Sequence, residues 1–137
     1  MGLILDTSAI VTAERQGDSV PRILSRMRDV LGDAEVGLSV VSVIELTHGI
    51  QRARHETQRQ RREAFVEELI AAVAVYPVTV EIAQRAGLIS GREAARGVNL
   101  PLEDLLIGAT ALQLGFEVVT ENIRHFQLIP NLVVKSL

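Results

Sequence analysis

The sequence contains no cysteine, which excludes disulfide bonds and metal sites built on thiolates. Aromatic residues are also scarce, because 137 residues include only three phenylalanines and one tyrosine. Stacking of bases on aromatic rings is a common way to recognise nucleic acids. If the protein binds a nucleic acid, we therefore expect shape and backbone contacts to dominate.

Long apolar runs are absent as well. The longest uncharged stretches, residues 69–80 and 105–116, fall short of the roughly 18 to 20 apolar residues that a membrane-spanning helix needs. The first residues lack the positive region and long apolar region of a secretion signal. The sequence therefore predicts no membrane segment, and we expect the protein to stay in the cytoplasm.

Length and hydrophobicity indicate one folded domain over residues 1–137. A chain of this length matches the commonest domain size and can bury an independent core. Hydrophobic residues make up 47% of the sequence, which is high for a water-soluble domain. This content favours a sheet buried on both faces together with an apolar surface that receives a partner.

Positive charge is unevenly distributed. The net charge of −3 argues against tight non-specific binding to nucleic acid, and Lys135 is the only lysine. The range 52–62, however, contains five arginines and a single acid, Glu56. Arginine can bind phosphates in a bidentate manner, but the same residues could form a solvated helical surface paired with following acids. Both interpretations remain open at the level of sequence.

Apolar strands alternate with amphipathic helical segments along the chain. Strands are predicted at 3–6, 35–40, 75–78, 117–120 and 132–134, the last at a sheet edge. Helices are predicted at 8–15, 20–31, 42–54, 56–74, 80–96 and 101–114, with a short helical turn at 123–126. Strands separated by helices indicate an α/β fold, with a mostly parallel sheet of four to five strands covered on both faces.

Several helix ends have recognisable signals. Thr7 or Ser8 is the expected cap of the first helix, and Ser42 is expected to open the third, with Glu45 at the spacing of a capping box. Pro101 suits a helix start, and Gly115 is expected to end that helix in the left-handed conformation.

Three acids, Asp6, Glu45 and Asp104, occur at predicted helix starts beside apolar sequence. Each has a structural explanation, as a helix cap, a capping-box member or an acid favoured by the helix dipole. Together they indicate more, because strand ends of a parallel sheet meet at one edge, where such folds bind ligands. Carboxylates brought together raise one another's pKa unless a cation neutralises them. The joint pattern therefore predicts a site for a divalent metal.

Four sequence strings, in order, resemble the signatures of PIN-domain ribonucleases. They are Leu-Asp-Thr-Ser-Ala at 5–9, Val-Ser-Val-Ile-Glu-Leu-Thr-His-Gly at 41–49, Asp-Leu-Leu-Ile-Gly-Ala-Thr-Ala-Leu at 104–112, and Val-Thr-Glu-Asn-Ile-Arg-His-Phe at 119–126. Their order and spacing are similar to those of the VapC toxins of bacterial toxin-antitoxin modules. The resemblance implies a PIN-like α/β/α sandwich and an endonuclease that cuts RNA with Mg²⁺ or Mn²⁺.

The resemblance also implies roles for individual residues. Asp6, Glu45 and Asp104 occupy the three acidic positions of the family and would hold the metal. Asn122 falls where some members have a fourth acid, so it joins the catalytic set while leaving the number of metal ions open, since an amide binds hard cations more weakly than a carboxylate. Glu103 or Glu121 could compensate, or both could simply face solvent.

Partners are implied in the same way. VapC-like proteins form homodimers and bury an apolar groove against a VapB-like antitoxin, an arginine of which would enter the acidic cluster. The segments 20–31 and 56–74 are the expected groove walls. His48, His55 and His125 are expected to be packing or surface residues.

Other functions fit less well or need other evidence. A catalytically silent PIN-like domain that binds RNA or a protein is the principal alternative. A signalling receiver domain would need two adjacent N-terminal acids and a late lysine after a strand, which this chain lacks. No P-loop or dinucleotide-binding glycine motif is present, and no nucleophile elbow of a serine hydrolase.

Overall fold

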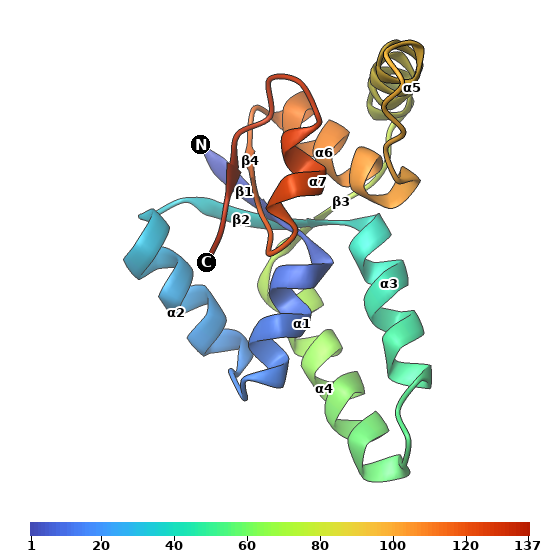
Figure 1. Ribbon diagram of the computed structural model, residues 1–137. Coiled ribbons are helices and arrows are strands. Elements are labelled where there is room, and N and C mark those ends of the chain that lie inside the picture. Colours follow the sequence, from blue (N-terminus) through green and yellow to red (C-terminus); the bar gives the residue numbers. More distant parts are fainter.

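A computed structural model describes residues 1–137. At its centre is a five-stranded sheet, with every pair of neighbouring strands parallel, in the order β3-β2-β1-β4-β5 (Figure 1). The strands are β1 (Gly2–Leu5), β2 (Glu35–Ser39), β3 (Ala74–Tyr76), β4 (Glu117–Val119) and β5 (Val134–Lys135). The expected parallel α/β sheet is confirmed, and β5 lies at the predicted edge.

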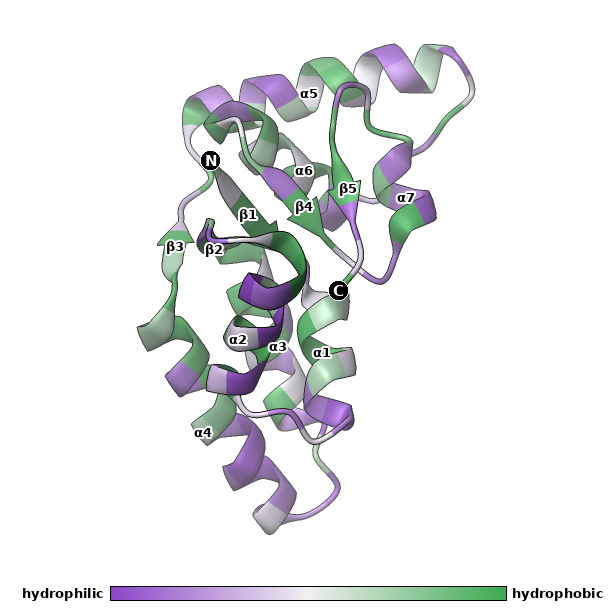
Figure 2. Ribbon diagram, turned by 90° about the vertical axis from the view of Figure 1, so that its left-hand side faces the viewer, coloured by the Kyte–Doolittle hydropathy of each residue, from purple (hydrophilic) through white to green (hydrophobic).

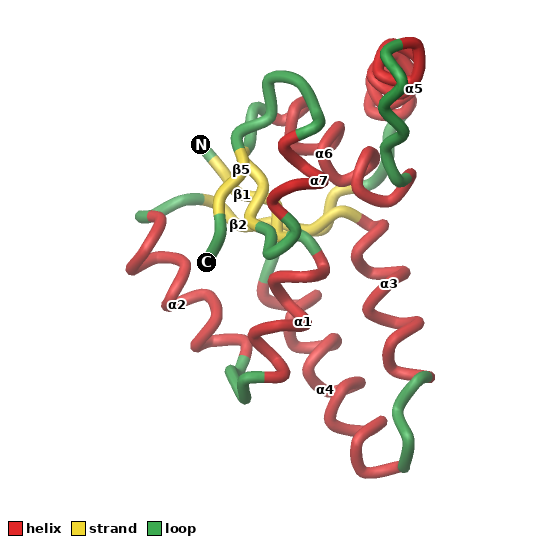
Figure 3. Tube along the Cα trace, in the orientation of Figure 1, coloured by secondary structure: helices red, strands yellow, loops and turns green.

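Seven helices surround this sheet (Figure 3). They are α1 (Thr7–Arg15), α2 (Val20–Leu31), α3 (Val40–Gln51), α4 (Glu56–Ala72), α5 (Val80–Ala95), α6 (Leu102–Leu114) and α7 (Ile123–Gln127). Most predicted elements agree with the observed ones apart from one or two residues at their ends, where boundaries are least determined.

The two faces of the sheet carry separate cores. Successive side chains of a strand point to opposite faces, so Leu3 and Leu5 pack with α1, α2, α3 and α4, whereas Ile4 packs with α6 and α7. The helix α5 lies outside α6 and forms a third cluster with it. In Figure 2 the strand β1 and the end of β4 are hydrophobic, while the distal part of α4 is hydrophilic. The architecture is therefore an α/β/α sandwich, as predicted.

The sheet position of α6 explains its composition. Residues Ile107 to Ala111 are all buried, because this helix lies between the sheet on one side and α5 on the other. A helix covered on two sides is apolar around most of its circumference. Gly115 ends α6 with φ 71°, the left-handed conformation that the sequence predicts.

The start of α3 differs from the prediction. Ser39, not Ser42, caps this helix, and its hydroxyl accepts a hydrogen bond of 3.1 Å from the Val41 N–H. Ser42 is buried inside the first turns, and its hydroxyl lies 3.1 Å from that of Thr7. The capping box with Glu45 was therefore wrong, and the carboxyl of Glu45 is free to contact another element.

Of the residues considered as the cap of α1, Asp6 is the one observed, in place of Thr7 or Ser8. Asp6 is the cap, with its carboxylate accepting from the Ser8 N–H at 3.3 Å. Thr7 already belongs to the helix, so its side chain can reach α3. No helix of the protein combines the length and apolar character needed to cross a membrane.

Candidate active site

Asp6 lies where β1 ends and α1 begins, at the carboxyl edge of the sheet. Its side chain is only 5% exposed, and Oδ2 accepts hydrogen bonds from the hydroxyls of Ser8 (2.6 Å) and Thr120 (2.8 Å). The Asp6 N–H donates to the Val119 carbonyl at 2.9 Å, which joins β1 to β4 at this point. A buried carboxylate is tolerated where such donors replace water. Asp6 is thus held in one orientation by residues from both ends of the chain.

Glu45 reaches the same edge from α3. The Thr7 hydroxyl donates to Oε1 of Glu45 at 2.8 Å, and the Thr7 backbone follows directly after Asp6. This contact joins the start of α1 to the second turn of α3. Glu45 is therefore placed beside Asp6 by a residue that sequence analysis treated only as a possible helix cap.

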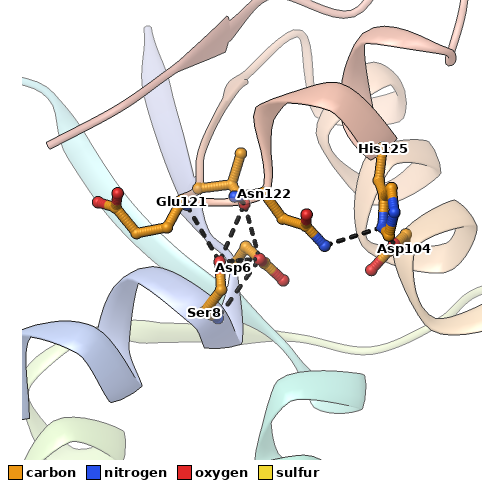
Figure 4. A network of polar contacts seen from close by, with 7 residues as sticks. Asp6, Ser8, Asp104, Glu121, Asn122 and His125 are labelled. Atoms are coloured by element: carbon orange, nitrogen blue, oxygen red, sulfur yellow. Dashed lines mark hydrogen bonds and ion pairs between the residues drawn. The ribbon is translucent and has the colours of Figure 1, made fainter.

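Asp104 lies in the first turn of α6. Its Oδ2 is 3.3 Å from Nδ1 of His125, and the same ring nitrogen is 2.8 Å from Nδ2 of Asn122. The Asn122 N–H donates to the Thr120 hydroxyl at 2.8 Å. Figure 4 shows the resulting chain of polar contacts, which runs from Asp6 through the β4–α7 connection to Asp104.

The charges of neighbouring acids raise the pKa of Glu45 and of Asp104. Burial raises the pKa of the Glu45 carboxyl, the Thr7 hydrogen bond partly lowers it, and the charges of Asp6, Asp104 and Glu103 raise it further. Burial likewise raises the pKa of the Asp104 carboxyl, as does the charge of Asp6, while His125 lowers it. Repulsion of this kind is relieved when a cation binds among the carboxylates.

The three acids carry oxygen donors of the type that magnesium and manganese ions prefer, but they do not form a ready-made metal site. No three histidine, aspartate or glutamate side chains lie close enough together to form a ready-made ligand cluster. Mg²⁺ does not require one, because it keeps several waters and takes one or two carboxylates together with substrate phosphate. Asp6 and Asp104 supply oxygen ligands of the kind that this ion prefers.

Glu121 and Glu103, the two further acids considered for the site, lie in different environments. Glu121 is exposed, and Figure 4 shows its carboxylate directed away from Asp104, so its backbone N–H, which donates to Ser8, is its contact with the site. Glu103 is also exposed but lines a groove beside Glu45. Of these two acids, only Glu103 raises the pKa of the Glu45 and Asp104 carboxyls.

Sequence analysis missed the role of His125. It is exposed, as expected of a surface residue, but its ring also contacts Asp104 and Asn122. The spacing of three residues between Asn122 and His125, across the start of a short helix, is the signal that could have indicated this contact. His48 and His55 are exposed, and His55 caps α4 by accepting from the Gln58 N–H at 3.4 Å.

A groove of about 850 Å³ opens beside Glu45, between α1, α3, α4 and the start of α6. Apolar residues form part of its walls, and Ile44 and Leu102 are 68% and 64% exposed. The expected wall 56–74 contributes Arg62 and Val66, but the segment 20–31 does not line this groove. The second wall is instead α1 and α3, since α2 lies on the far side of α1 (Figure 1).

Comparisons with known proteins agree with this geometry. The family model described as PIN domain matches residues 3–131. Ribonuclease VapC of Rickettsia bellii is 30% identical over 137 residues, covering 100% of this chain and 97% of the relative, and Ribonuclease VapC1 of Rickettsia felis is 28% identical over the same shares. A crystal structure of VapBC2 from Rickettsia felis bound to a promoter DNA fragment superposes with a TM-score of 0.84 at 18% identity, covering 99% and 98% of the two chains.

An α/β/α sandwich with three acids at the carboxyl edge of a parallel sheet is the arrangement that the sequence motifs predicted. The chain belongs to the PIN-domain family, and the relatives that it matches over its whole length are VapC ribonucleases.

Proposed function

We propose that this protein is a single-domain, metal-dependent endoribonuclease that hydrolyses RNA in the cytoplasm as the toxin of a VapBC-type toxin-antitoxin pair. The observation that carries the proposal is the convergence of Asp6, Glu45 and Asp104 on one edge of the sheet, where the charges of Asp6 and Asp104 raise the pKa of Glu45 and the charge of Asp6 raises that of Asp104. The family match and the ribonuclease relatives support the reaction class.

Asp6 and Asp104 would hold Mg²⁺ or Mn²⁺ directly, and Glu45 directly or through water. When bound, the metal would polarise the scissile phosphate and lower the pKa of a bound water, so that hydrolysis needs no covalent enzyme intermediate. The acidic trio is the reason to prefer this chemistry over a silent binding domain.

The surrounding residues keep the acids in place. Ser8 and Thr120 orient the Asp6 carboxylate, Thr7 orients Glu45, and His125 contacts Asp104. Asn122, which contacts Thr120 and His125, would orient a water or a phosphate oxygen through its amide. The amino-terminal end of α6, next to Asp104, favours the negative charge of RNA phosphate.

The proposed protein partner is a VapB-like antitoxin that covers the groove beside Glu45. Solved structures with this fold include VapBC complexes. An arginine of the antitoxin, placed among the acids, would neutralise them much as a cation does. Assembly of the toxin as a homodimer is part of the same proposal.

Cleavage of RNA by variants with altered acids tests the proposal. Purified wild-type protein is expected to cut total cellular RNA with Mg²⁺ or Mn²⁺ and to stop when EDTA is added. Asp6→Asn and Asp104→Asn should lose cleavage while folding normally, whereas Asp29→Asn, an exposed acid on α2, should keep it. Full activity of either site variant refutes the assigned roles.

The silent-domain alternative predicts a different result. In that case wild-type protein binds RNA or antitoxin but shows no metal-dependent cleavage under any of these conditions. Activity that survives EDTA would contradict metal dependence while leaving the nuclease assignment intact.

A further inference from the structure

The groove beside Glu45 is divided by charge. Glu45 and Glu103 line it near the start of α6, whereas Arg52 and Arg54 line it where α3 ends. An α-helix rises 1.5 Å per residue, so the seven residues from Glu45 to Arg52 correspond to roughly 10 Å along the groove. Figure 1 shows the connection between α3 and α4 at the end of these helices remote from the sheet. One groove therefore joins the acidic site to a cationic end.

Four arginines outside this groove are neutralised by an acid, whereas three that line the groove are not. Elsewhere Arg22 and Arg26 pair with Asp18, and Arg96 pairs with Glu93. Arg15, Arg52 and Arg54 line the groove, are exposed, and form no ion pair. Their guanidinium groups are therefore available to a ligand.

Two further residues, Arg62 and Glu14, line the groove near its cationic end. Arg62 donates to the Gly49 carbonyl at 2.7 Å and so fixes the end of α3 against α4. Glu14 also lines the groove, and its carboxyl, whose pKa burial raises, faces Arg62 and Arg15. Arg52 and Arg54 have no comparable acid beside them in the groove lining.

An RNA backbone matches this distribution of charge. An RNA strand that is cut at the acidic end has further phosphates on both sides of the cleaved bond. On one of these sides the strand can follow the groove to the arginines. Arginine binds phosphate oxygens in a bidentate manner. The exposed side chains of Ile44 and Leu102, between the ends, can contact ribose and base surfaces without reading a sequence.

We propose that Arg52 and Arg54, with Arg15 across the groove, bind RNA phosphates that flank the cleaved one. This inference rests on the proposed ribonuclease function and adds to it the direction in which the RNA strand leaves the acidic site. It also explains how a protein with net charge −3 can bind RNA, since these arginines lie in the same groove as the acidic site.

Salt-dependent binding of a single-stranded oligoribonucleotide tests the inference separately from cleavage. A fluorescent oligoribonucleotide of mixed sequence is titrated with protein in EDTA at several salt concentrations. The double variant Arg52→Ala/Arg54→Ala should bind on the order of tenfold more weakly, and the slope of log K against log salt should fall by about 0.7 per lost phosphate contact. Arg15→Ala should show a smaller change in the same direction.

A matched control removes two arginines elsewhere. Arg28 and Arg92 are exposed and form no ion pair, so Arg28→Ala/Arg92→Ala changes the net charge equally without touching the groove. This variant should keep the affinity and salt slope of wild type. Arg52→Lys/Arg54→Lys should keep most of the slope, because the charges remain.

Cleavage of the same RNA with Mg²⁺ separates the two proposals. If wild type cleaves and the double variant keeps the same KM, affinity and slope, the arginine assignment is wrong and the nuclease assignment stands. If the double variant loses affinity and salt slope but wild type never cleaves, RNA binding by these arginines stands and the nuclease assignment fails. Absence of salt-dependent binding by wild type, or a loss in the variant confined to antitoxin binding, overturns the inference.

Discussion

Thr120 donates a hydrogen bond of 2.8 Å to Oδ2 of Asp6, although 114 residues separate them in the chain. The contact exists because β1 and β4 are neighbours in the sheet, with Leu5 opposite Val119. Each residue is the first after its strand, so the strand register determines their meeting. The orientation of the central carboxylate therefore depends on the pairing of these two strands.

Replacing Thr120 by valine should weaken both the fold and the site. Valine keeps the shape but removes the hydroxyl, which leaves the buried Asp6 carboxylate with one donor fewer. Hydrogen bonds to charged groups contribute about 1.5 to 3 kcal/mol, so we expect a loss of that order in the free energy of unfolding, measured by urea denaturation. Mn²⁺ affinity and RNA cleavage should fall with it.

Thr110 provides the matched control for this change. It is also buried, but its hydroxyl donates to the Leu106 carbonyl in its own helix at 2.7 Å. Thr110→Val should leave Mn²⁺ affinity at the wild-type level. Equal loss of metal affinity in both valine variants would show that Thr120 acts only through stability.

His125→Ala should weaken metal binding and cleavage while leaving the fold intact, because the ring is half exposed and contacts Asp104 and Asn122. Residues that orient metal ligands change affinity or activity by about 10- to 100-fold when removed. Titration with Mn²⁺ measures the effect without RNA. His55→Asn, which keeps a good helix cap remote from the acids, should behave as wild type, and unchanged Mn²⁺ affinity of His125→Ala would contradict the positioning role.

Glu14→Gln should change the pH dependence of stability. Burial raises the pKa of the Glu14 carboxyl above 4.5, with Arg62 and Arg15 opposing the shift. The folded protein then binds this proton more tightly than the unfolded chain, so the contribution of Glu14 to stability is greatest below pH 4.5 and falls as pH rises through the folded pKa. The stability of the Gln variant relative to wild type should therefore be higher at pH 7 than at pH 4.

Denaturation of both proteins across this pH range measures the difference. A relative stability that does not change with pH, or that rises toward acid pH, would show that the arginines outweigh burial. The account of the groove charges would then need revision, since Glu14 would be a stabilising partner of Arg15 and Arg62.

The sequence predicted the sheet well, for a physical reason. Strands and amphipathic helices are recognised in a sequence by the spacing of their apolar residues. The alternation of Leu3, Ile4 and Leu5 between the two faces of the sheet follows directly from the period of a strand. The carboxyl edge of a parallel sheet then brings Asp6 and the start of α3 together whatever the details. The meeting of Asp6 and α3 is therefore a consequence of topology, whereas Asp104 lies on α6, which no strand directly precedes.

Details of the site depended on competition between similar local signals. Ser39 and Ser42 are both suitable caps, and the one that lies at the end of β2 prevailed, which turned Ser42 toward Thr7. The contact of His125 with Asp104 arises between elements that only tertiary packing brings together. Local sequence patterns carry no information on such contacts.

Binding of Mn²⁺ in the absence of RNA tests the central claim most directly. The account predicts that wild type and the surface control Asp29→Asn bind the ion at one affinity. Asp6→Asn and Asp104→Asn should bind it at least about tenfold more weakly, because an amide binds a hard cation more weakly than a carboxylate does, and a tenfold loss corresponds to about 1.4 kcal/mol. Equal Mn²⁺ affinity in all four proteins would contradict the claim that these acids form the metal site.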